Sequence, residues 1–470
     1  AELKTALREA DFVVAVAPLL PDTERLFNRQ HFAAMRRTAY FINVGRGGLL
    51  DEEALTTALQ EGLIAGAAID VTEAEPLPPD SPLWSAPNLL ITPHLAGASE
   101  KLWQRHAELL FQNLDRPATA ERGGQRERVL NAMKAIQVVK YGAPEVLELR
   151  SLPKPTPRAG EVVVGVEAAG INFAAILMRL GLYPGVPRPP FTPGLEVAGT
   201  VEAVGADVKT PRAGDRVVVI SFGGGYAEKL VVSAQRVIPL PAAVNFDDAA
   251  ALPVNYLTAY QALTYMAHLR AGERVLIHAA AGGVGLAAIQ FCRLAGAEMF
   301  GTASAAKHDF LRQRGLEHPI DYHTKDFEAE VRRLTTGEGV DVVLDAVGGV
   351  SYRKSYRLLR HGGRLICYGL SSAVPGKGRS LKALGAWWST PSFNAMDLIG
   401  KNRAVMGVHL GTMGRAQPAR VRAWMEELFR LYRDGKIKPH IGARFPLREA
   451  AQAHDFIHER KNLGKVLLHP

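Results

Sequence analysis

The residues with the clearest chemical purpose form a glycine-rich turn between an apolar stretch and a helical pattern. Residues 275–285 read Val-Leu-Ile-His-Ala-Ala-Ala-Gly-Gly-Val-Gly. In a turn of this kind, glycines make the bend, let the backbone approach a pyrophosphate and let the helix pack on the strand. The free N–H groups at the helix start attract phosphate. We therefore predict a dinucleotide site whose turn residues are Ala281, Gly282, Gly283, Val284 and Gly285.

The end of the next predicted strand indicates which dinucleotide binds. An NAD site normally carries Asp or Glu about twenty residues after the turn, where it holds the ribose 2′-hydroxyl. Residues 303–307 read Ala-Ser-Ala-Ala-Lys instead. The hydroxyl of Ser304 and the ammonium of Lys307 suit a 2′-phosphate. The sequence favours NADP(H) over NAD(H), with a solvated surface lysine as the alternative for Lys307.

The elements around this turn indicate two domains of different type. Residues 133–253 alternate short apolar strands with Pro and Gly turns, as in a compact β-barrel. Residues from about 256 to 400 alternate strands with helices, which is typical of a parallel, doubly wound sheet. The last residues, from Arg420, are predicted to return to the first domain. Residues 1–115 also alternate strand and helix, and the polar segment 116–130 reads as a linker.

Length and composition exclude several classes of function. A chain of 470 residues is too long for one core. Two cysteines exclude a disulfide framework and a four-cysteine zinc site. The net charge of +9 comes without a lysine-rich run interleaved with aromatics, so no nucleic-acid partner is expected. Neither a signal peptide nor a long apolar run is evident, so we expect a cytoplasmic protein without a membrane span.

The front segment carries a second set of reactive side chains, Arg46, Glu75 and His94. An arginine binds a carboxylate through two hydrogen bonds, and a Glu–His pair makes imidazole a proton donor. The surrounding phrases, NVGRGGLLDEEAL, AAIDVTEAEPLP and LLITPHLAGAS, resemble the D-2-hydroxyacid dehydrogenases. That resemblance implies that Arg46 binds the substrate carboxylate, that Glu75 tunes His94 and that His94 is the acid/base.

The same segment departs from that family in what it lacks. No glycine fingerprint precedes its first strand, and the family's substrate lobe is missing. We therefore predict a partial domain over 1–115 that is inert alone, and NAD binding only if another chain completes it.

Residues 133–470 show a more extensive resemblance. The phrases GINFAAILMRLGLYPG, PGLEVAGTVEAVG, LPVNYLTAYQAL, HAAAGGVG and DVVLDAVGG resemble the zinc-independent quinone oxidoreductase branch of the medium-chain dehydrogenases/reductases. NRAVMGVHLG and KNLGKVLL point more narrowly to the vesicle amine transport protein 1-like group. The resemblance implies a GroES-like domain over 131–255 and 405–470, an NADP-binding Rossmann domain over 256–404, and a homodimer.

Two local phrases bear on the metal. Zinc-dependent relatives carry Cys and Gly-His-Glu where this chain has Gly170-Ile171-Asn172 and Gly194-Leu195-Glu196. A lone Glu196 cannot hold zinc. We therefore expect no metal, and chemistry that rests on the cofactor, geometry and hydrogen bonds.

The resemblance implies hydride transfer from NADPH to a quinone or an enone. Negative charge then develops on the carbonyl oxygen, and hydrogen-bond donors aimed at that oxygen lower the barrier. Asn172 and Tyr183 are the candidate donors, with Thr258 beside the nicotinamide. The remaining residues expected to contact the cofactor are Asn255, Tyr322, Tyr368, Gly369 and Arg460.

Two other classes of function remain open. A bifunctional oxidoreductase would also act on 2-hydroxy or 2-keto acids, with activity that depends on Arg46 and His94. A non-catalytic NADPH-binding protein would bind the cofactor and show negligible turnover on any quinone or enone.

Overall fold

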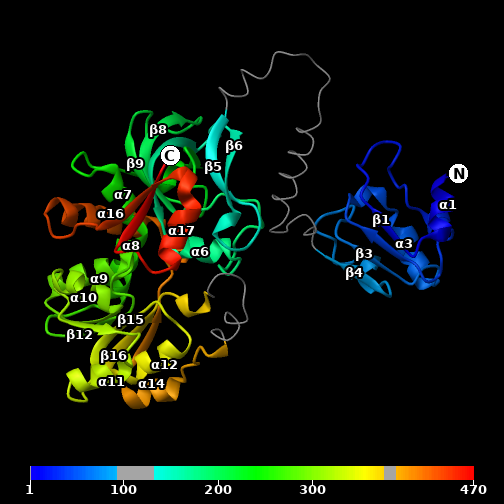
Figure 1. Cartoon of the computed structure of the whole chain (residues 1–470). Helices are drawn as coiled ribbons and strands as arrows, with labels where there is room; N and C mark the ends of the chain where they lie inside the picture. Colours follow the sequence, from blue (N-terminus) through cyan, green and yellow to red (C-terminus); the bar gives the residue numbers. More distant parts are fainter. Residues whose placement is uncertain (1, 93–131, 375–387) are drawn as a thin grey trace. The chain divides into compact units, whose positions relative to one another are not determined.

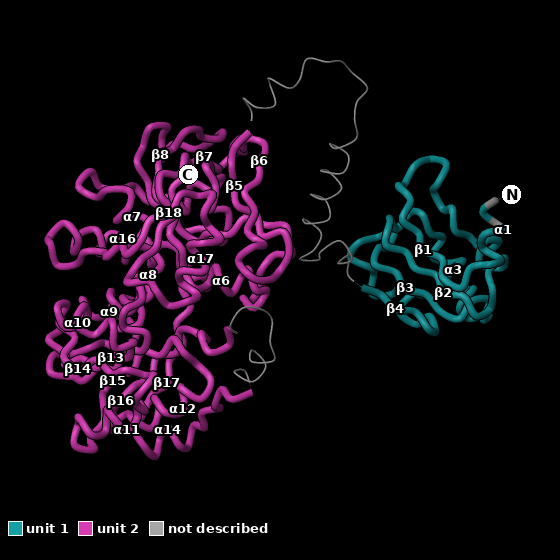
Figure 2. The backbone as a smooth tube through the Cα atoms, in the orientation of Figure 1, with its two compact units in different colours: residues 1–122 teal, residues 123–470 magenta. Residues whose placement is uncertain are grey.

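The chain divides into two compact units, Ala1–Arg122 and Gly123–Pro470 (Figure 2). The structure is a computed structural model that describes residues 2–92, 132–374 and 388–470. His94 and the predicted linker 116–130 lie outside the described residues. Each unit is described by itself.

The first unit is built on a four-stranded parallel sheet in the order β1-β2-β3-β4. Its strands are β1 (Phe12–Ala15), β2 (Tyr40–Asn43), β3 (Gly66–Ile69) and β4 (Leu89–Ile91). Its helices are α1 (Glu2–Glu9), α2 (Arg29–Phe32) and α3 (Glu52–Gln60), with short 3-10 turns at Gly47–Leu49 and Pro82–Ser85. Asp51 caps α3 by accepting a 3.0 Å hydrogen bond from the Ala54 amide.

The two faces of this sheet differ. Successive side chains of a strand point to opposite faces. Phe41 and its neighbours on one face are buried in a core with Phe32 and Leu55. On the other face, Phe12 stacks on Tyr40, and their exposed fractions are 65% and 46%. Apolar side chains of this face are therefore exposed within the described part of the unit.

The second unit begins with a strand-rich domain whose main sheet has the order β11-β9-β8-β7-β19-β18, with β10 on β7. Its strands are β7 (Glu161–Ile171), β8 (Glu196–Val204), β9 (Arg216–Ile220), β10 (Lys229–Ser233), β11 (Val237–Pro239), β18 (Ile441–Pro446) and β19 (Lys465–His469). β5 (Ala132–Val138) and β6 (Leu147–Pro153) form a separate antiparallel pair. The helices α6 (Phe173–Arg179), α7 (Phe246–Ala251) and α17 (Ala450–His458) accompany these sheets.

The chain's last strand closes this domain. β19 pairs antiparallel with β7, with Leu467 opposite Gly170 (Figure 1). The predicted return of the C-terminal residues is confirmed by this pairing.

The other half of the second unit is a six-stranded parallel sheet in the order β14-β13-β12-β15-β16-β17. Its strands are β12 (Arg274–Ile277), β13 (Glu298–Ala303), β14 (His318–Asp321), β15 (Val340–Asp345), β16 (Leu359–Cys367) and β17 (Ala404–Gly407). The chain order reverses between β12 and β15, which is the arrangement of a doubly wound nucleotide-binding fold. The predicted α/β fold class is confirmed.

Helices connect and flank these strands. They are α8 (Pro253–Tyr260), α9 (Gly283–Ala295), α10 (His308–Arg312), α11 (Phe327–Leu334), α12 (Val350–Arg357), α14 (Ala395–Lys401), α15 (Leu410–Ala416) and α16 (Pro418–Arg433). The predicted domain boundary at 404/405 falls inside β17, which pairs with β16 along its length. The boundary at 255/256 falls inside α8.

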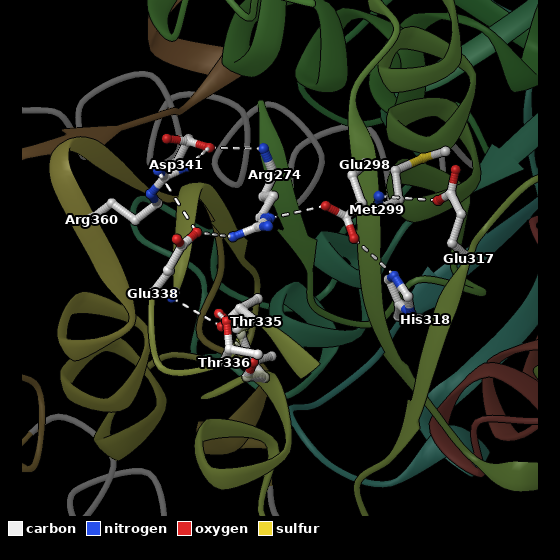
Figure 3. A network of polar contacts seen from close by, with 12 residues as sticks. Arg274, Glu298, Met299, Glu317, His318, Thr335, Thr336, Glu338, Asp341 and Arg360 are labelled. Carbon is white, nitrogen blue, oxygen red and sulfur yellow. Dashed lines mark hydrogen bonds and ion pairs between the residues drawn. The ribbon is translucent and has the colours of Figure 1, made fainter. Parts of the chain in front are cut away.

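A polar network ties the amino ends of the parallel strands together (Figure 3). Arg274 at the start of β12 donates to Glu298 of β13 at 2.9 Å and to Glu338 at 2.6 Å. Glu298 also contacts His318 of β14 at 2.9 Å. These charges lie at the edge of the sheet away from the glycine turn, so they stabilise the sheet without entering the nucleotide site.

Candidate functional site

The glycine turn joins β12 to α9 as the sequence predicts. Gly282 precedes the first helical residue, Gly283. A Cβ on Gly285 would lie 2.5 Å from the carbonyl oxygen of Ala280, and one on Gly283 would collide with the side-chain amide of Asn255. Only glycine lets α9 start this close to the strand and to α8. The crowding also places Asn255 directly against the turn.

The C-terminal loop crosses this turn. The Gly464 amide donates to the carbonyl oxygen of Ala281 at 2.8 Å, and a parallel bridge joins Gly282 to Gly464. The loop that precedes β19 therefore links the nucleotide-binding sheet to the barrel sheet beside the predicted pyrophosphate position.

Ser304 and Lys307, predicted to hold a 2′-phosphate, lie together with Tyr322 and Arg460, which are also expected to contact the cofactor. The Lys307 ammonium donates to the carbonyl oxygens of Arg460, at 2.5 Å, and Asn462, at 2.8 Å. The Arg460 guanidinium lies over the Tyr322 ring, 5.4 Å from its centroid. Ser304 starts the turn that ends at Lys307. Burial, and then the charge of Arg460, lower the pKa of Lys307. The two cations repel each other, and a bound anion would relieve that repulsion.

The remaining predicted cofactor residues lie at the same edge of the sheet. Tyr368 and Gly369 follow the carboxyl end of β16, and the Gly369 carbonyl accepts a 2.5 Å hydrogen bond from the Tyr352 hydroxyl. Asn255 and Thr258 are both on α8, with exposed fractions of 7% and 8%. Ligands of open parallel sheets bind at this edge, beside the reversal of strand order.

Asn172 belongs to a buried polar cluster. Its side-chain nitrogen donates to Glu196 at 2.7 Å and to the Gly170 carbonyl at 3.4 Å, and its oxygen accepts from the Lys465 ammonium at 2.8 Å. Lys465 and Glu196 also form an ion pair, and the other Glu196 oxygen accepts from the Val254 amide at 2.7 Å. Burial lowers the pKa of Lys465, and the charge of Glu196 opposes that shift. Asn172 thus already has two acceptors for its amide protons.

Tyr183 lies in a different polar setting. Its hydroxyl is 3.2 Å from Nε2 of His409, the residue that caps α15. Burial raises the pKa of Tyr183, and the charge of Arg415 opposes that rise. Tyr183 comes from the barrel domain and His409 follows β17, so this contact joins the two domains of the second unit.

Sequence reasoning missed two residues of this site, Lys465 and His409. Both lie in phrases that carry the family resemblance, KNLGKVLL and NRAVMGVHLG. A lysine at the head of the apolar strand Val-Leu-Leu was a usable signal, because a buried ammonium needs a partner. For His409 the sequence holds no such signal.

In the first unit the structure describes two of the three reactive residues. Arg46 donates to the carbonyl oxygen of its neighbour Gly45 at 2.8 Å. Glu75 is exposed and accepts from the Thr72 amide at 3.2 Å. His94 lies outside the described residues, so the predicted Arg46, Glu75 and His94 set stays a prediction.

The described residues contain neither a cluster of metal-binding side chains nor a helix that could span a membrane. In the ranges 2–92, 132–374 and 388–470, three or more His, Cys, Asp or Glu side chains nowhere gather as a metal site would require. Across those same ranges no helix has the length and apolar character needed to cross a bilayer. Where zinc-dependent relatives carry zinc ligands, Glu196 forms an ion pair with Lys465.

The barrel and the reversed parallel sheet define an oxidoreductase of the medium-chain dehydrogenase/reductase class. Family models agree with this architecture. "Alcohol dehydrogenase GroES-like domain" matches residues 158–242, and "Zinc-binding dehydrogenase" matches residues 314–468. "D-isomer specific 2-hydroxyacid dehydrogenase, NAD binding domain" matches residues 1–96.

Individual relatives indicate a narrower group within this class. The human synaptic vesicle membrane protein VAT-1 homolog is 41% identical over 342 residues, which are 72% of this chain and 86% of that protein. Human quinone oxidoreductase is 33% identical over 340 residues, 72% of this chain and 97% of its own length. Escherichia coli quinone oxidoreductase complexed with NADPH superposes with a TM-score of 0.64 at 34% identity, covering 72% of this chain and all (100%) of that one.

The chain therefore belongs to the zinc-independent medium-chain dehydrogenases/reductases, in the group of quinone oxidoreductases and VAT-1 homologues. The predicted resemblance is confirmed for both parts of the chain. The relatives support an oxidoreductase with a nicotinamide cofactor.

Proposed function

We propose that the second unit reduces quinones or α,β-unsaturated carbonyl compounds with NADPH. The observation that carries this proposal is the group of Ser304, Lys307, Tyr322 and Arg460 at the end of β13, where two cations meet and no acid follows the strand. A dinucleotide with a 2′-phosphate fits this charge, because an acid at the strand end would repel it. The glycine turn fits the pyrophosphate.

The proposed substrate class follows from the named activities of the relatives. Quinone oxidoreductases and the CurK enoyl reductase, with a TM-score of 0.62 at 31% identity, act on electron-poor double bonds by name. When bound, NADPH supplies a hydride. The chain's own contribution is to hold the substrate beside α8 and to offer a hydrogen-bond donor to the oxygen on which charge develops.

We assign that donation to Tyr183. Its hydroxyl contacts His409, which follows β17 of the parallel sheet, and burial keeps the pKa of Tyr183 raised, so the proton stays on the oxygen at neutral pH. Asn172 instead holds Glu196 and Lys465 in place, because its amide protons already have acceptors.

Cofactor titration of the full chain tests this proposal. Nicotinamide fluorescence should show NADPH binding at least about tenfold tighter than NADH, and Arg460→Ala should remove most of that preference. Equal affinities for the two cofactors would overturn the NADPH assignment. Tight NADPH binding without turnover of any quinone or enone would leave a binding protein in place of a reductase.

A further inference from the structure

Tyr183 and His409 form a contact whose hydrogen positions are fixed by a third group. The Tyr183 hydroxyl lies 3.2 Å from Nε2 of His409. The other ring nitrogen, Nδ1, lies 3.0 Å from the backbone nitrogen of Thr412. Thr412 also donates its hydroxyl to the His409 carbonyl at 2.9 Å. Both ring nitrogens of His409 therefore have a hydrogen-bond partner.

The contact with Thr412 selects one tautomer of the ring. A backbone amide can only donate, so Nδ1 must be the acceptor and carries no proton. The proton of the neutral imidazole then lies on Nε2, which donates to the Tyr183 oxygen. Because that oxygen accepts from His409, the hydroxyl proton of Tyr183 has to point elsewhere.

We propose that His409 is a positioning residue that turns the hydroxyl proton of Tyr183 toward the substrate oxygen. This inference rests on the proposed function. It adds a residue from the nucleotide-binding domain, at the carboxyl end of β17, to a donor from the barrel domain. The donor is thereby oriented only when the two domains meet.

The step balances as follows for an enone. The hydride that bound NADPH would supply leaves the nicotinamide, which is oxidised to NADP⁺, and forms a C–H bond at the β-carbon. The C=C pair shifts toward the carbonyl carbon, and the C=O π pair moves onto the carbonyl oxygen. That oxygen takes the Tyr183 proton to give the enol, which tautomerises in water to the saturated ketone, and the tyrosyl oxygen keeps a hydrogen bond from Nε2 of His409. Solvent returns one proton to Tyr183, since both side chains reach solvent. A neutral His409 cannot supply that proton itself, so its role is to orient and stabilise.

The surrounding charges agree with this role. Arg415, on the helix that His409 caps, lies over the Phe222 ring at 4.7 Å, and Arg236 lies over the same ring at 4.5 Å. The charge of Arg415 opposes the rise that burial causes in the pKa of Tyr183. A cation near the tyrosyl oxygen favours the negative charge that it carries briefly.

Two substitutions separate orientation from helix capping. In His409→Asn the side-chain oxygen still caps α15, because Asn is a preferred N-cap residue, but no N–H reaches Tyr183. In His409→Gln the side-chain nitrogen replaces Nε2 and still donates to Tyr183, but the cap is lost. We expect His409→Asn to lower kcat about fivefold to tenfold with KM for NADPH unchanged. His409→Gln should stay within about threefold of the wild-type kcat and show the lower melting temperature.

Tyr183→Phe and the double variant Tyr183→Phe/His409→Asn complete the test. If His409 acts through Tyr183, the double variant should be no slower than Tyr183→Phe alone. A wild-type kcat in His409→Asn with a reduced kcat in His409→Gln would overturn the inference and leave His409 as a helix cap. A wild-type kcat in Tyr183→Phe would instead remove Tyr183 from the proposed function, so the two failures are distinguishable.

Discussion

The chain contains two parallel sheets of the nucleotide-binding type, and they differ in strand order. In the first unit the described strands follow each other as β1-β2-β3-β4 without a reversal. In the second unit the order reverses between β12 and β15, and the glycine turn, Tyr368 and Gly369 lie at that reversal. Where the strand order reverses, the connections that leave the two neighbouring strands diverge, and a crevice for a ligand opens between them. Two similar architectures thus offer very different sites.

The two units also differ in how their apolar faces are covered. In the second unit the apolar side chains in the middle of β12, β15 and β16, such as Leu276, Val343 and Leu365, are fully buried. In the first, Phe12, Val14 and Leu90 of the sheet have exposed fractions of 65%, 52% and 62%. The family model that matches residues 1–96 covers an NAD-binding domain, yet the described strands of the first unit show no reversal of order. This comparison predicts that the cofactor binds in the second unit.

The largest expected effect comes from the glycine turn. Gly285→Val places a side chain against the Ala280 carbonyl, so NADPH affinity should fall by about 100-fold or more. The matched change in the first unit is Gly47→Val, which meets the backbone of Thr72 and should leave NADPH affinity unchanged. Fluorescence titration measures both, and circular dichroism checks the fold. Loss of binding in Gly47→Val would break the comparison.

A buried ion pair in the second unit should contribute more to stability than an exposed ion pair in the first unit. Lys465→Met leaves Glu196 buried without its cation and should cost about 3–5 kcal/mol of unfolding free energy. In the first unit, Arg29→Met removes a pair whose side chains are 62% and 42% exposed, and should cost less than about 1 kcal/mol. Urea unfolding of the full chain measures both values. Similar losses for the two variants would contradict this account.

Acid should destabilise the second unit selectively. Burial, with the charges of Arg179 and His458, lowers the pKa of His454 from 6.5 to about 3. Below pH 6.5, His454 therefore binds a proton in the unfolded chain but stays neutral in the folded chain. Stability falls as pH falls from 6.5 toward 3. The loss from this group should reach about 2 kcal/mol by pH 5.

Calorimetry from pH 7 to 5 measures this loss, and His454→Phe should flatten the slope. The one histidine in the described part of the first unit, His31, is half-buried, whereas His454 is fully buried. An unchanged slope in His454→Phe would rule out this origin.

The smallest effect is expected in the front segment. Arg46→Ala and Glu75→Gln change side chains that lie on the surface of the first unit. Quinone reduction with NADPH should stay within about twofold of wild type, because the proposed cofactor and donor residues all belong to the second unit. Steady-state kinetics of the full chain provide the measurement. A large loss in either variant would indicate a bifunctional enzyme.

Local pattern predicted most of the fold, and distant pairings account for what it missed. Val275 to Gly285 predicted a strand, a turn and a helix, because all three depend on neighbouring residues. Asn172 was predicted as a hydrogen-bond donor to the substrate, but Lys465 reaches it from 293 residues away through the pairing of β19 with β7. Tyr183 and His409 are 226 residues apart. The spacing of residues along the chain carries no information about such contacts.

The measurement that tests the central claim most directly is the stoichiometry of NADPH binding by the full chain and by Gly285→Val. Isothermal titration calorimetry should give one NADPH per wild-type chain, and none for Gly285→Val, with NADH adding no second site to either protein. A nicotinamide site that survives Gly285→Val would contradict the account and place cofactor binding in the first unit.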